Sequence, residues 1–322
     1  MACEHDDRSS LPLSRRGFVG AAAATVAAVS GVARAAAPSR PASSAASAPS
    51  IVSLAARPPA GFSPMCAPGL VARVSKSNTL QPNLLWPTEF AARVMLERVM
   101  EELTGIADLG RAFAKFVHPG DKVAVKLNGI GAQKGATMGT NKELVVEIVK
   151  GILAAGIAPS DCWVFEQFPS FLAGTRVRES VLPAGVKTYT HNNQDATMQQ
   201  IFVEGVGTKF VRQLTEATAV INVSLIKDHG ICGYTGALKN MTHGCVINPQ
   251  AFHAHTATPQ IALLYAHDVI KSRVRLNITD GFKVIYNGGP LDRDKTARVP
   301  HECVYASTDP VALDMIGLQV VE

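Results

Sequence analysis

The residue types best suited to chemistry gather in one segment, residues 226–248, which is dense in lysine, histidine, glycine and amide side chains. Lys227 and Lys239 supply positive charge that suits a carboxylate or a phosphate. His229 and His243 carry imidazoles, whose intrinsic pKa allows proton transfer near neutral pH. We therefore predict a site for a small anion in which His229, His243 and Lys239 are the catalytic residues.

Glycine and amide groups add binding capacity to the same segment. Thr235 and Gly236 are expected to open a short helix, whose N-terminal N–H groups would favour an anion. Further binding side chains are expected directly after neighbouring strands. The predicted ligand-binding residues are Lys126, Asn128, Glu166, Lys227, Asp228, Thr235, Gly236 and Asn240.

Structural roles stand beside these functional ones. Lys126 has two interpretations of equal weight, a ligand or a strand-end lysine whose stem packs and whose ammonium is solvated. For Asp309 the role of a helix N-cap is favoured over chemistry. For the lysines and histidines of residues 226–248 function is favoured, since clustered charge is costly without a purpose.

The cofactor is unknown from the sequence, and a divalent transition metal is one hypothesis. Neutral imidazole is a common metal ligand, so His229 with Asp280 could form an N/O site. No spacing matches a defined zinc motif. An iron–sulfur cluster is not expected, because the five cysteines after residue 37 lack the C-x2-C-x2-C spacing.

The elements that must position these residues alternate between strands and helices. Strands are expected over residues 122–128, 162–167, 186–191, 219–225, 275–279 and 301–306, and helices over about 88–103, 140–156, 259–271 and from 310. Residues 219–225 form a continuous apolar run, which is typical of a parallel sheet. Thr140 and Glu143 form a capping box. We predict an α/β fold, a mostly parallel open sheet covered by helices, in one domain with insertions.

The candidate residues lie at the predicted carboxyl ends of these strands, where open α/β sheets bind ligands. Lys126 and Asn128 close one strand and Glu166 closes another. Asp280 follows a later strand, as the lysine and histidine segment follows residues 219–225. Independent surface residues would scatter over both edges of the sheet. This coincidence predicts a single site at one edge.

The first residues indicate export. Residues 14–19, SRRGFV, fit the twin-arginine signal, and an apolar run with cleavage sites after Ala35 or Ala37 follows. We expect a signal peptide over 1–37, a disordered Pro/Ala/Ser-rich linker over 38–68 and the α/β domain over 69–322; continuation beyond Glu322 is left open. The twin-arginine machinery is then a partner, the location is periplasmic or extracytoplasmic, and membrane contact is expected only if the signal remains uncleaved.

Composition fits a globular protein, with 322 residues, 47% hydrophobic and 18% charged. The net charge of +5 is mild and includes no basic run, so nucleic-acid binding is not expected. The expected partner is a small anionic molecule. Two functions remain open: an exported enzyme acting on that molecule, or an exported protein that binds an anion or metal complex without turnover.

Several separated motifs resemble one family. PGDKVAVKLN, TNKELVVEIVKGILAAG, VINVSLIKDHGICGYTGALKNMTHG, ITDG and STDPVALD occur in this order and are similar to the domain-of-unknown-function family DUF362, in its exported twin-arginine branch. The resemblance runs from about Leu70 to the end of the chain and implies no established activity. The order of elements is also distantly similar to nickel-pincer lactate racemase, a fold-level likeness that transfers no chemistry.

Overall fold

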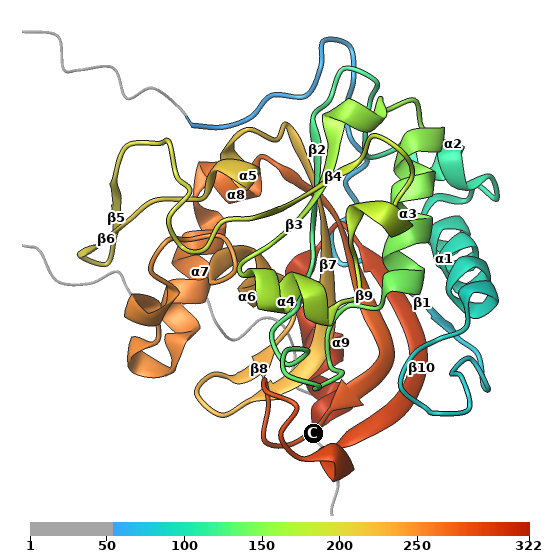
Figure 1. The fold of residues 1–322 in the computed structure, drawn as a ribbon. Coiled ribbons are helices and arrows are strands. Elements are labelled where there is room, and N and C mark those ends of the chain that lie inside the picture. The colour runs from blue at the N-terminus through green and yellow to red at the C-terminus, as the bar shows by residue number, and fades with distance from the viewer. Residues whose placement is uncertain (1–53) are drawn as a thin grey trace, which may run out of the picture. The chain divides into compact units, whose positions relative to one another are not determined.

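The computed structural model describes residues 54–322, apart from the side chain of His255 (Figure 1). The predicted signal peptide and the first part of the linker lie outside the described residues. Residues 54–68, the end of that linker, form no helix or strand, yet they are held against the domain. The N–H of Ala56 donates to Ser272 Oγ at 2.8 Å, and the N–H of Met65 donates to the carbonyl of Lys115 at 2.8 Å.

The main sheet has the strand order β1-β10-β9-β7-β2-β3-β4, with β8 paired to β7. Its strands are β1 Ala72–Ser75, β2 Val123–Lys126, β3 Cys162–Glu166, β4 Lys187–Thr190, β7 Ala219–His229, β8 Gly233–Thr235, β9 Val274–Ile285 and β10 Arg298–Ser307; a separate hairpin pairs β5 Ile201–Val203 with β6 Val206–Thr208. The five strands from β9 to β4 are parallel to their neighbours, while β1, β10 and β8 pair antiparallel. The predicted α/β class, a mostly parallel open sheet covered by helices, is confirmed.

Helices cover both faces of this sheet (Figure 1). The α-helices are α1 Glu89–Thr104, α2 Leu109–Phe113, α3 Lys142–Ala154, α4 Pro169–Gly174, α5 Arg212–Thr215, α6 Ala237–Thr242, α7 Thr258–Ala266, α8 Asp268–Lys271 and α9 Pro310–Val321. Short 3-10 helices are η1 Pro159–Asp161, η2 Glu179–Val181, η3 Pro249–Phe252, η4 Ala254–Ala257 and η5 Lys295–Ala297. Among residues 54–322, no helix is both long and apolar enough to span a bilayer.

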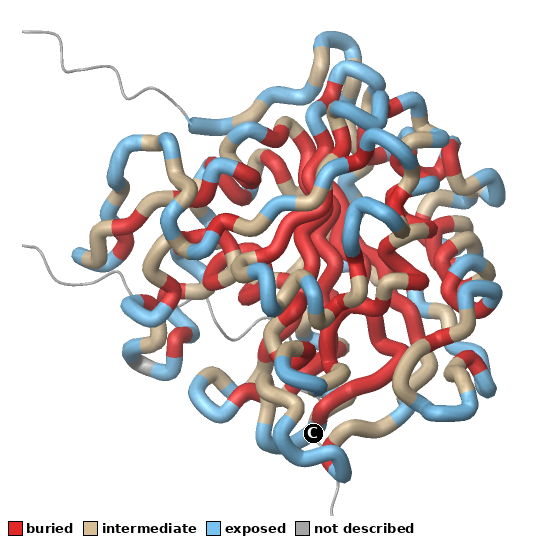
Figure 2. The backbone as a smooth tube through the Cα atoms, in the orientation of Figure 1, coloured by how far each residue is buried: buried red, intermediate tan, exposed pale blue. Residues whose placement is uncertain are grey.

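The alternating direction of the side chains along β2 explains why the sheet has a hydrophobic core on each face. Val123 and Val125 point into a core shared with α1, α2 and α3, whereas Ala124 packs into a second core with residues of α6, α7 and α8. Successive side chains of a strand face opposite sides of a sheet, so a strand covered on both sides is apolar throughout. The central strands are accordingly buried along their length (Figure 2).

β7 and β9 end several residues later than predicted, and this moves the expected strand ends. β7 continues through Lys227 to His229 because β8 pairs with it, with His229 opposite Gly233. β9 continues past Asp280 to Ile285, with a register shift against β7 after Asp280. From the sequence, the polar residues in these extensions are expected to form loops. Their strand character depends on pairing with other segments, which the local hydrophobic pattern does not reveal.

Helix starts agree with the sequence at some sites and differ at others. The carboxylate of Asp309 accepts from the N–H groups of Val311 and Ala312 at 2.9 and 3.0 Å, which confirms the N-cap. The prediction of a capping box at Thr140 is wrong, because α3 begins after Asn141 and has no side-chain cap. The predicted helix over 259–271 is split into α7 and α8 at His267, whose extended backbone interrupts it.

Candidate functional site

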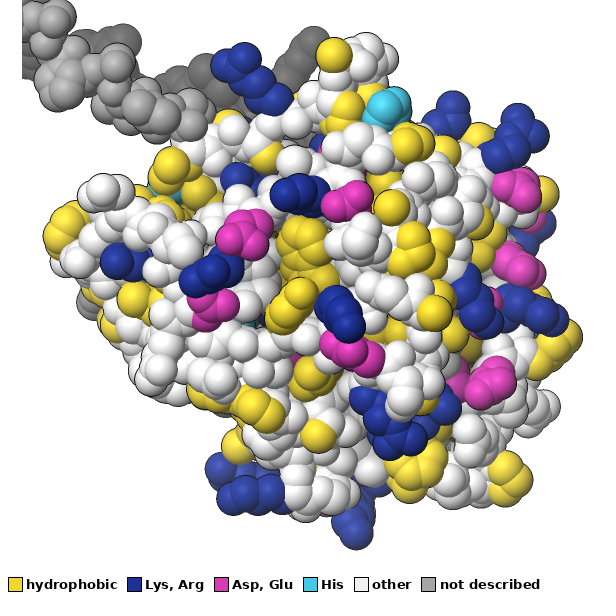
Figure 3. All heavy atoms as spheres, turned by 45° about the horizontal axis from the view of Figure 1, so that its top comes forward, with side chains coloured by type: hydrophobic (Ala, Val, Ile, Leu, Met, Phe, Trp, Pro, Cys, Tyr) yellow, Lys and Arg dark blue, Asp and Glu magenta, His cyan; other side chains and the backbone are white. Residues whose placement is uncertain are grey.

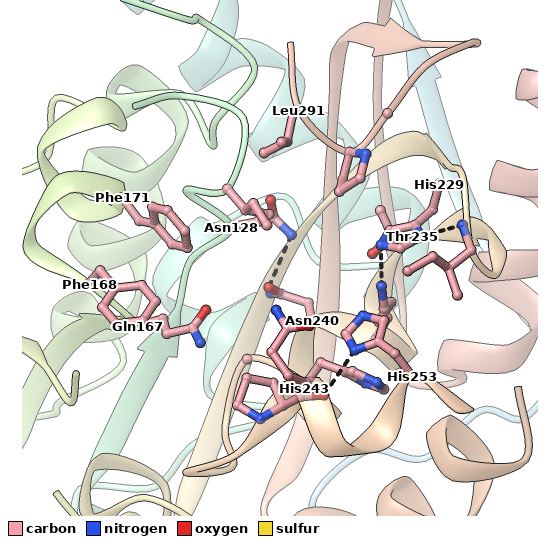
Figure 4. Close-up of a pocket in the computed structure, with 18 of the residues that line it drawn as sticks. Asn128, Gln167, Phe168, Phe171, His229, Thr235, Asn240, His243, His253 and Leu291 are labelled. Carbon is pink, nitrogen blue, oxygen red and sulfur yellow. Dashed lines mark hydrogen bonds between the residues drawn. The ribbon is translucent and has the colours of Figure 1, made fainter. Parts of the chain in front are cut away.

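A cavity of about 610 Å³ lies at the carboxyl ends of β2, β3 and β7. Its polar lining comes from the ends of these strands, from α6, from η3 with the following His253, and from the loop at residues 288–293 (Figure 4). Eight of the predicted residues line it: Lys126, Asn128, Glu166, His229, Thr235, Lys239, Asn240 and His243. The other predicted residues, Lys227, Asp228, Gly236 and Asp280, do not line it. The structure thus brings most of the predicted set to one cavity.

Lys126 is neutralised inside the protein. Its side chain is fully buried, and its Nζ donates to Glu166 Oε2 and to the carbonyl of Leu127, each at 2.5 Å. The amide of Asn240 lies 3.4 Å from the same ammonium. The interpretation of a solvated strand-end lysine is wrong, because β3 and α6 enclose the charge. Lys126 and Glu166 form a buried pair beneath the cavity.

Lys227 is also occupied by the protein itself. Its Nζ donates to Asn128 Oδ1 at 2.7 Å and to the carbonyls of Ile130 and Met138 at 2.5 and 3.3 Å. Complete burial lowers the pKa of Lys227 to about 7. These acceptors lie in the glycine-rich loop between β2 and α3. Lys227 therefore clamps that loop and does not reach the cavity lining.

Lys239 and His229 form a close contact between two basic groups in the cavity lining. Lys239 Nζ lies 2.5 Å from His229 Nε2, and His229 Nδ1 accepts from the N–H of Ile231 at 3.1 Å. Both side chains are largely buried, at 7% and 6% exposed. Burial lowers the pKa of Lys239, and burial together with the Lys239 charge lowers the pKa of His229 to about 4. Two basic groups at this distance favour a state in which at least one is uncharged.

Two further imidazoles complete the histidine wall (Figure 4). The rings of His243 and His253 have centroids 4.7 Å apart, and the rings of His229 and His253 are 6.0 Å apart. His243 is tied by both nitrogens, to the carbonyl of Phe252 at 2.8 Å and to Thr242 Oγ1 at 3.1 Å, and burial lowers its pKa to about 3. His253 Nδ1 lies 2.9 Å from the carbonyl of Pro249. His243 therefore supports the wall, and His253 is the imidazole with a nitrogen to spare.

The predicted anion site at the start of α6 is filled by the protein. The N–H groups of Ala237 and Leu238 donate to the carboxylate of Asp314, from α9, at 2.6 and 2.9 Å. A Cβ at Gly236 would lie 2.2 Å from Asp314 Oδ1, so glycine is required for this approach. Gly236 therefore allows the Asp314 carboxylate to approach the start of α6.

Replacing Asp314 with asparagine is expected to change how stability depends on pH. Burial raises the pKa of Asp314 to about 7, above its value in the unfolded chain. The contribution of the protonated Asp314 to the free energy of unfolding is therefore present at low pH and is lost as pH rises through 7. Relative to wild type, Asp314→Asn should gain about 2 to 3 kcal/mol in the free energy of unfolding between about pH 5 and about pH 8. Urea unfolding of both proteins at the two pH values measures this. An equal difference at both values would contradict it.

The two predicted aspartates have structural partners. Asp280 Oδ2 accepts from the backbone N–H of Asn141 at 2.6 Å, at the start of α3, and both of its oxygens lie 3.0 Å from the Asn141 amide nitrogen. Asp228 Oδ2 accepts from the N–H of Gly289 at 3.2 Å and holds the loop beside the cavity. The predicted metal pair of His229 and Asp280 is therefore not assembled, because only His229 lines the cavity. Within residues 54–322 no group of three or more His, Cys, Asp or Glu side chains is arranged to hold a metal ion.

The cavity also contains residues that the predicted set lacks. Phe168 and Phe171 form an apolar wall, with ring centroids 5.1 Å apart, facing the histidines (Figure 4). Arg293, exposed at the rim, and His253 line it as well. Phe168 follows the end of β3 by two residues, so a search at the carboxyl ends of the predicted strands could have found it. His253 lies in a histidine-rich stretch, which is also a signal in the sequence. Arg293 comes from an irregular loop and leaves no signal in the sequence.

Figure 3 shows one face of the outer surface. Basic and acidic side chains are intermixed there with apolar ones. Surface ion pairs such as Arg212–Asp195 at 2.7 Å and Lys187–Glu179 at 3.3 Å are of this intermixed kind.

The fold and the cavity define a class: an open, mostly parallel α/β domain with a polar cavity at its strand ends. The chain belongs to the DUF362 family, described as a domain of unknown function, whose model matches residues 123–319. The family resemblance is confirmed, and the twin-arginine branch stays a prediction. No curated protein matches the chain.

Solved structures show distant likeness. A protein from Thermotoga maritima is 11% identical with a TM-score of 0.44, and the match covers 73% of this chain and 59% of that one. The lactate racemase apoprotein from Thermoanaerobacterium thermosaccharolyticum is 12% identical with a TM-score of 0.43, covering 78% of this chain and 62% of that one. This chain therefore spans about three fifths of the length of either structure.

Proposed function

We propose that the protein is an enzyme that binds a small anionic substrate in this cavity and moves a proton on it, using Lys239 and His229. The observation that carries the proposal is the 2.5 Å contact between Lys239 Nζ and His229 Nε2 in the lining of the cavity. Buried titratable groups in mutual contact at a cavity are typical of active sites.

The hydrogen bonds of His229 assign the proton. Nδ1 accepts the N–H of Ile231, so in this arrangement it carries no proton itself. The proton of the neutral ring then lies on Nε2, which faces Lys239 Nζ. An ammonium has no lone pair to accept this bond, whereas an amine does. We infer that Lys239 is an amine whenever it accepts this bond, and an amine next to an N–H donor suits proton transfer.

The anionic group of the substrate has one candidate partner. The sequence predicts that Lys126, Lys227 and Lys239 bind the anion. Lys126 and Lys227, however, donate to protein acceptors. Arg293 lies exposed at the rim and has no side-chain hydrogen bond or ion pair among the described residues. A guanidinium suits bidentate contact with a carboxylate. We assign the carboxylate to Arg293 and the reacting centre to Lys239.

Hydrogen exchange at carbon tests the function without knowledge of the product. Pyruvate, phenylpyruvate, lactate and malate are incubated with the protein in D₂O, and deuterium uptake is compared with that in solutions without protein. At least one acid should exchange faster with wild type, and Lys239→Met should slow this by about 100-fold or more, because general acid–base groups contribute about that much. Lys271→Met, at an exposed lysine of α8, is the matched control and should match wild type.

The alternative function, binding without turnover, gives a different result. A pure binder would be stabilised by its ligand, by about 2.7 kcal/mol at a concentration 100 times the Kd, with no exchange. Thermal shift measured on the same four acids separates the two functions. Stabilisation by an acid that never exchanges would replace the enzyme proposal with the binding protein.

Export remains part of the proposal and rests on residues 14–19. A twin-arginine signal requires its arginine pair. Fractionation of cells that express wild type and an Arg15→Lys, Arg16→Lys variant tests it. Equal distribution of the two proteins between cytoplasm and periplasm would remove export from the proposal.

A further inference from the structure

Lys239 is a lysine without a counter-ion at a cavity. Glu166 is the one carboxylate among the residues that line the cavity, and it is paired with Lys126; no ion pair involves Lys239 among the described residues. Its partners are the nitrogen of His229 and the side chain of Cys232 instead. Ordinary lysines are ammonium ions, with a pKa of about 10.4, so that about one molecule in 2,500 is an amine at pH 7. An amine held in a cavity is a nucleophile as well as a base.

The amine is held in a fixed place. Lys239 lies on α6, whose first N–H groups are anchored to Asp314 from α9. His229 lies at the end of β7, where the hairpin with β8 and the N–H of Ile231 fix its ring. The two elements meet only in the folded structure. Preorganised groups of this kind favour covalent catalysis, since the nucleophile is already aligned.

We infer that the substrate is a carbonyl compound that forms an imine with Lys239, a refinement that rests on the proposed function. The Nζ lone pair bonds to the carbonyl carbon, and one amine proton passes to the carbonyl oxygen to give a carbinolamine. The hydroxyl and the second amine proton then leave as water, and a carbon–nitrogen double bond remains. No oxidant or reductant takes part. The imine nitrogen keeps a lone pair that accepts the N–H of His229.

The imine also explains why a proton would move. Donation by His229 to the imine nitrogen draws electrons from the substrate, so a C–H bond next to the former carbonyl carbon becomes acidic. His253 Nδ1 faces the carbonyl of Pro249, so its neutral tautomer has the lone pair on Nε2. His253 lines the same cavity and is the candidate base for that C–H. Lys239 and His253 thus have separate roles.

The walls of the cavity narrow the substrate to a 2-oxo acid with an apolar side chain. Arg293 at the rim suits its carboxylate, and Phe168 and Phe171 suit its side chain. The amides of Asn128, Asn240 and Gln167 line the polar part between them. Phenylpyruvate has all three features, and pyruvate has the carboxylate and the carbonyl alone.

Borohydride trapping tests the inference. The full chain is incubated with phenylpyruvate or pyruvate and sodium borohydride, digested, and mapped by mass spectrometry. We expect one reduced adduct per chain on Lys239, formed about 100-fold faster than on exposed Lys271, since so few ordinary lysines are amines. Lactate, which lacks the carbonyl, should give none. Lys239→Met and Lys239→Arg should lose the adduct. If a variant does not fold, the position of the adduct in the wild-type protein still decides the test.

The outcomes separate this inference from the proposed function. Lys239-dependent deuterium exchange with no adduct on Lys239 would overturn imine formation and leave proton transfer intact. An adduct on Lys239 without exchange would support imine formation and overturn proton transfer. Equal labelling of Lys239 and Lys271 would overturn the inference, because it would show no special amine.

Discussion

Replacing Glu166 with leucine is expected to lower the free energy of unfolding by about 3 to 5 kcal/mol. The variant leaves Lys126 in place without its carboxylate, although the lysine is completely buried. The carbonyl of Leu127 and the amide of Asn240 remain as acceptors and do not cancel the charge. Removing one partner of a buried ion pair is therefore far more costly than the pair is worth. Urea unfolding at neutral pH measures the loss.

A double variant tests this cause. Lys126→Met with Glu166→Leu removes both charges and should recover most of the stability, since an apolar pair of similar volume is often as stable as a buried ion pair. Glu179→Leu is the matched surface control, because the Glu179 carboxylate meets Lys187 at an exposed site. It should leave the free energy of unfolding close to that of wild type, because exposed ion pairs contribute little. A double variant as unstable as Glu166→Leu would contradict an uncompensated charge as the cause.

Replacing Lys227 with methionine is expected to have the second large effect, and its size depends on pH. The variant leaves the carbonyls of Ile130 and Met138 and the amide of Asn128 without their donor. Each buried acceptor left unsatisfied costs about 1 to 3 kcal/mol. The glycine-rich loop between β2 and α3 should loosen, which hydrogen exchange of its amides measures.

The pH dependence follows from the sign of the shift. Burial lowers the pKa of Lys227 to about 7 in the folded protein. The contribution of Lys227 to the free energy of unfolding is therefore present at high pH and is lost as pH falls through 7. The destabilisation by Lys227→Met should therefore be greater at about pH 9 than at about pH 7, by about 2 to 3 kcal/mol. Lys134→Met, at an exposed lysine of the same loop, should show neither effect. The same loss at both pH values would contradict the shift.

Much of the fold could be predicted because its signals are local. The continuous apolar run in β7 and the helical spacing in α1 are properties of short segments, and they establish alternating strands and helices. The rule that parallel strands present their carboxyl ends at one edge then brings Lys126, Glu166 and His229 together. These expectations need no knowledge of which helix packs against which strand.

The role of each polar residue could not be predicted in the same way. Asp280 and Asn141 are 139 positions apart, and Asp314 and Ala237 are 77 apart. These partners turn a predicted ligand into a helix anchor and fill a predicted anion site with a carboxylate. Pairings across such separations depend on the packing of whole elements, about which the local pattern contains no information.

The sequence by itself determined the class of fold, the edge of the sheet that carries the cavity and the kinds of side chain that reach it. Hydrophobic periodicity and strand geometry are enough for that, since both act over a few residues. Only the tertiary structure decided which lysine is available. It encloses Lys126 and Lys227 among protein acceptors and sets Lys239 against the nitrogen of His229. Burial and hydrogen bonding control the protonation of an amine, and both arise only when distant segments pack.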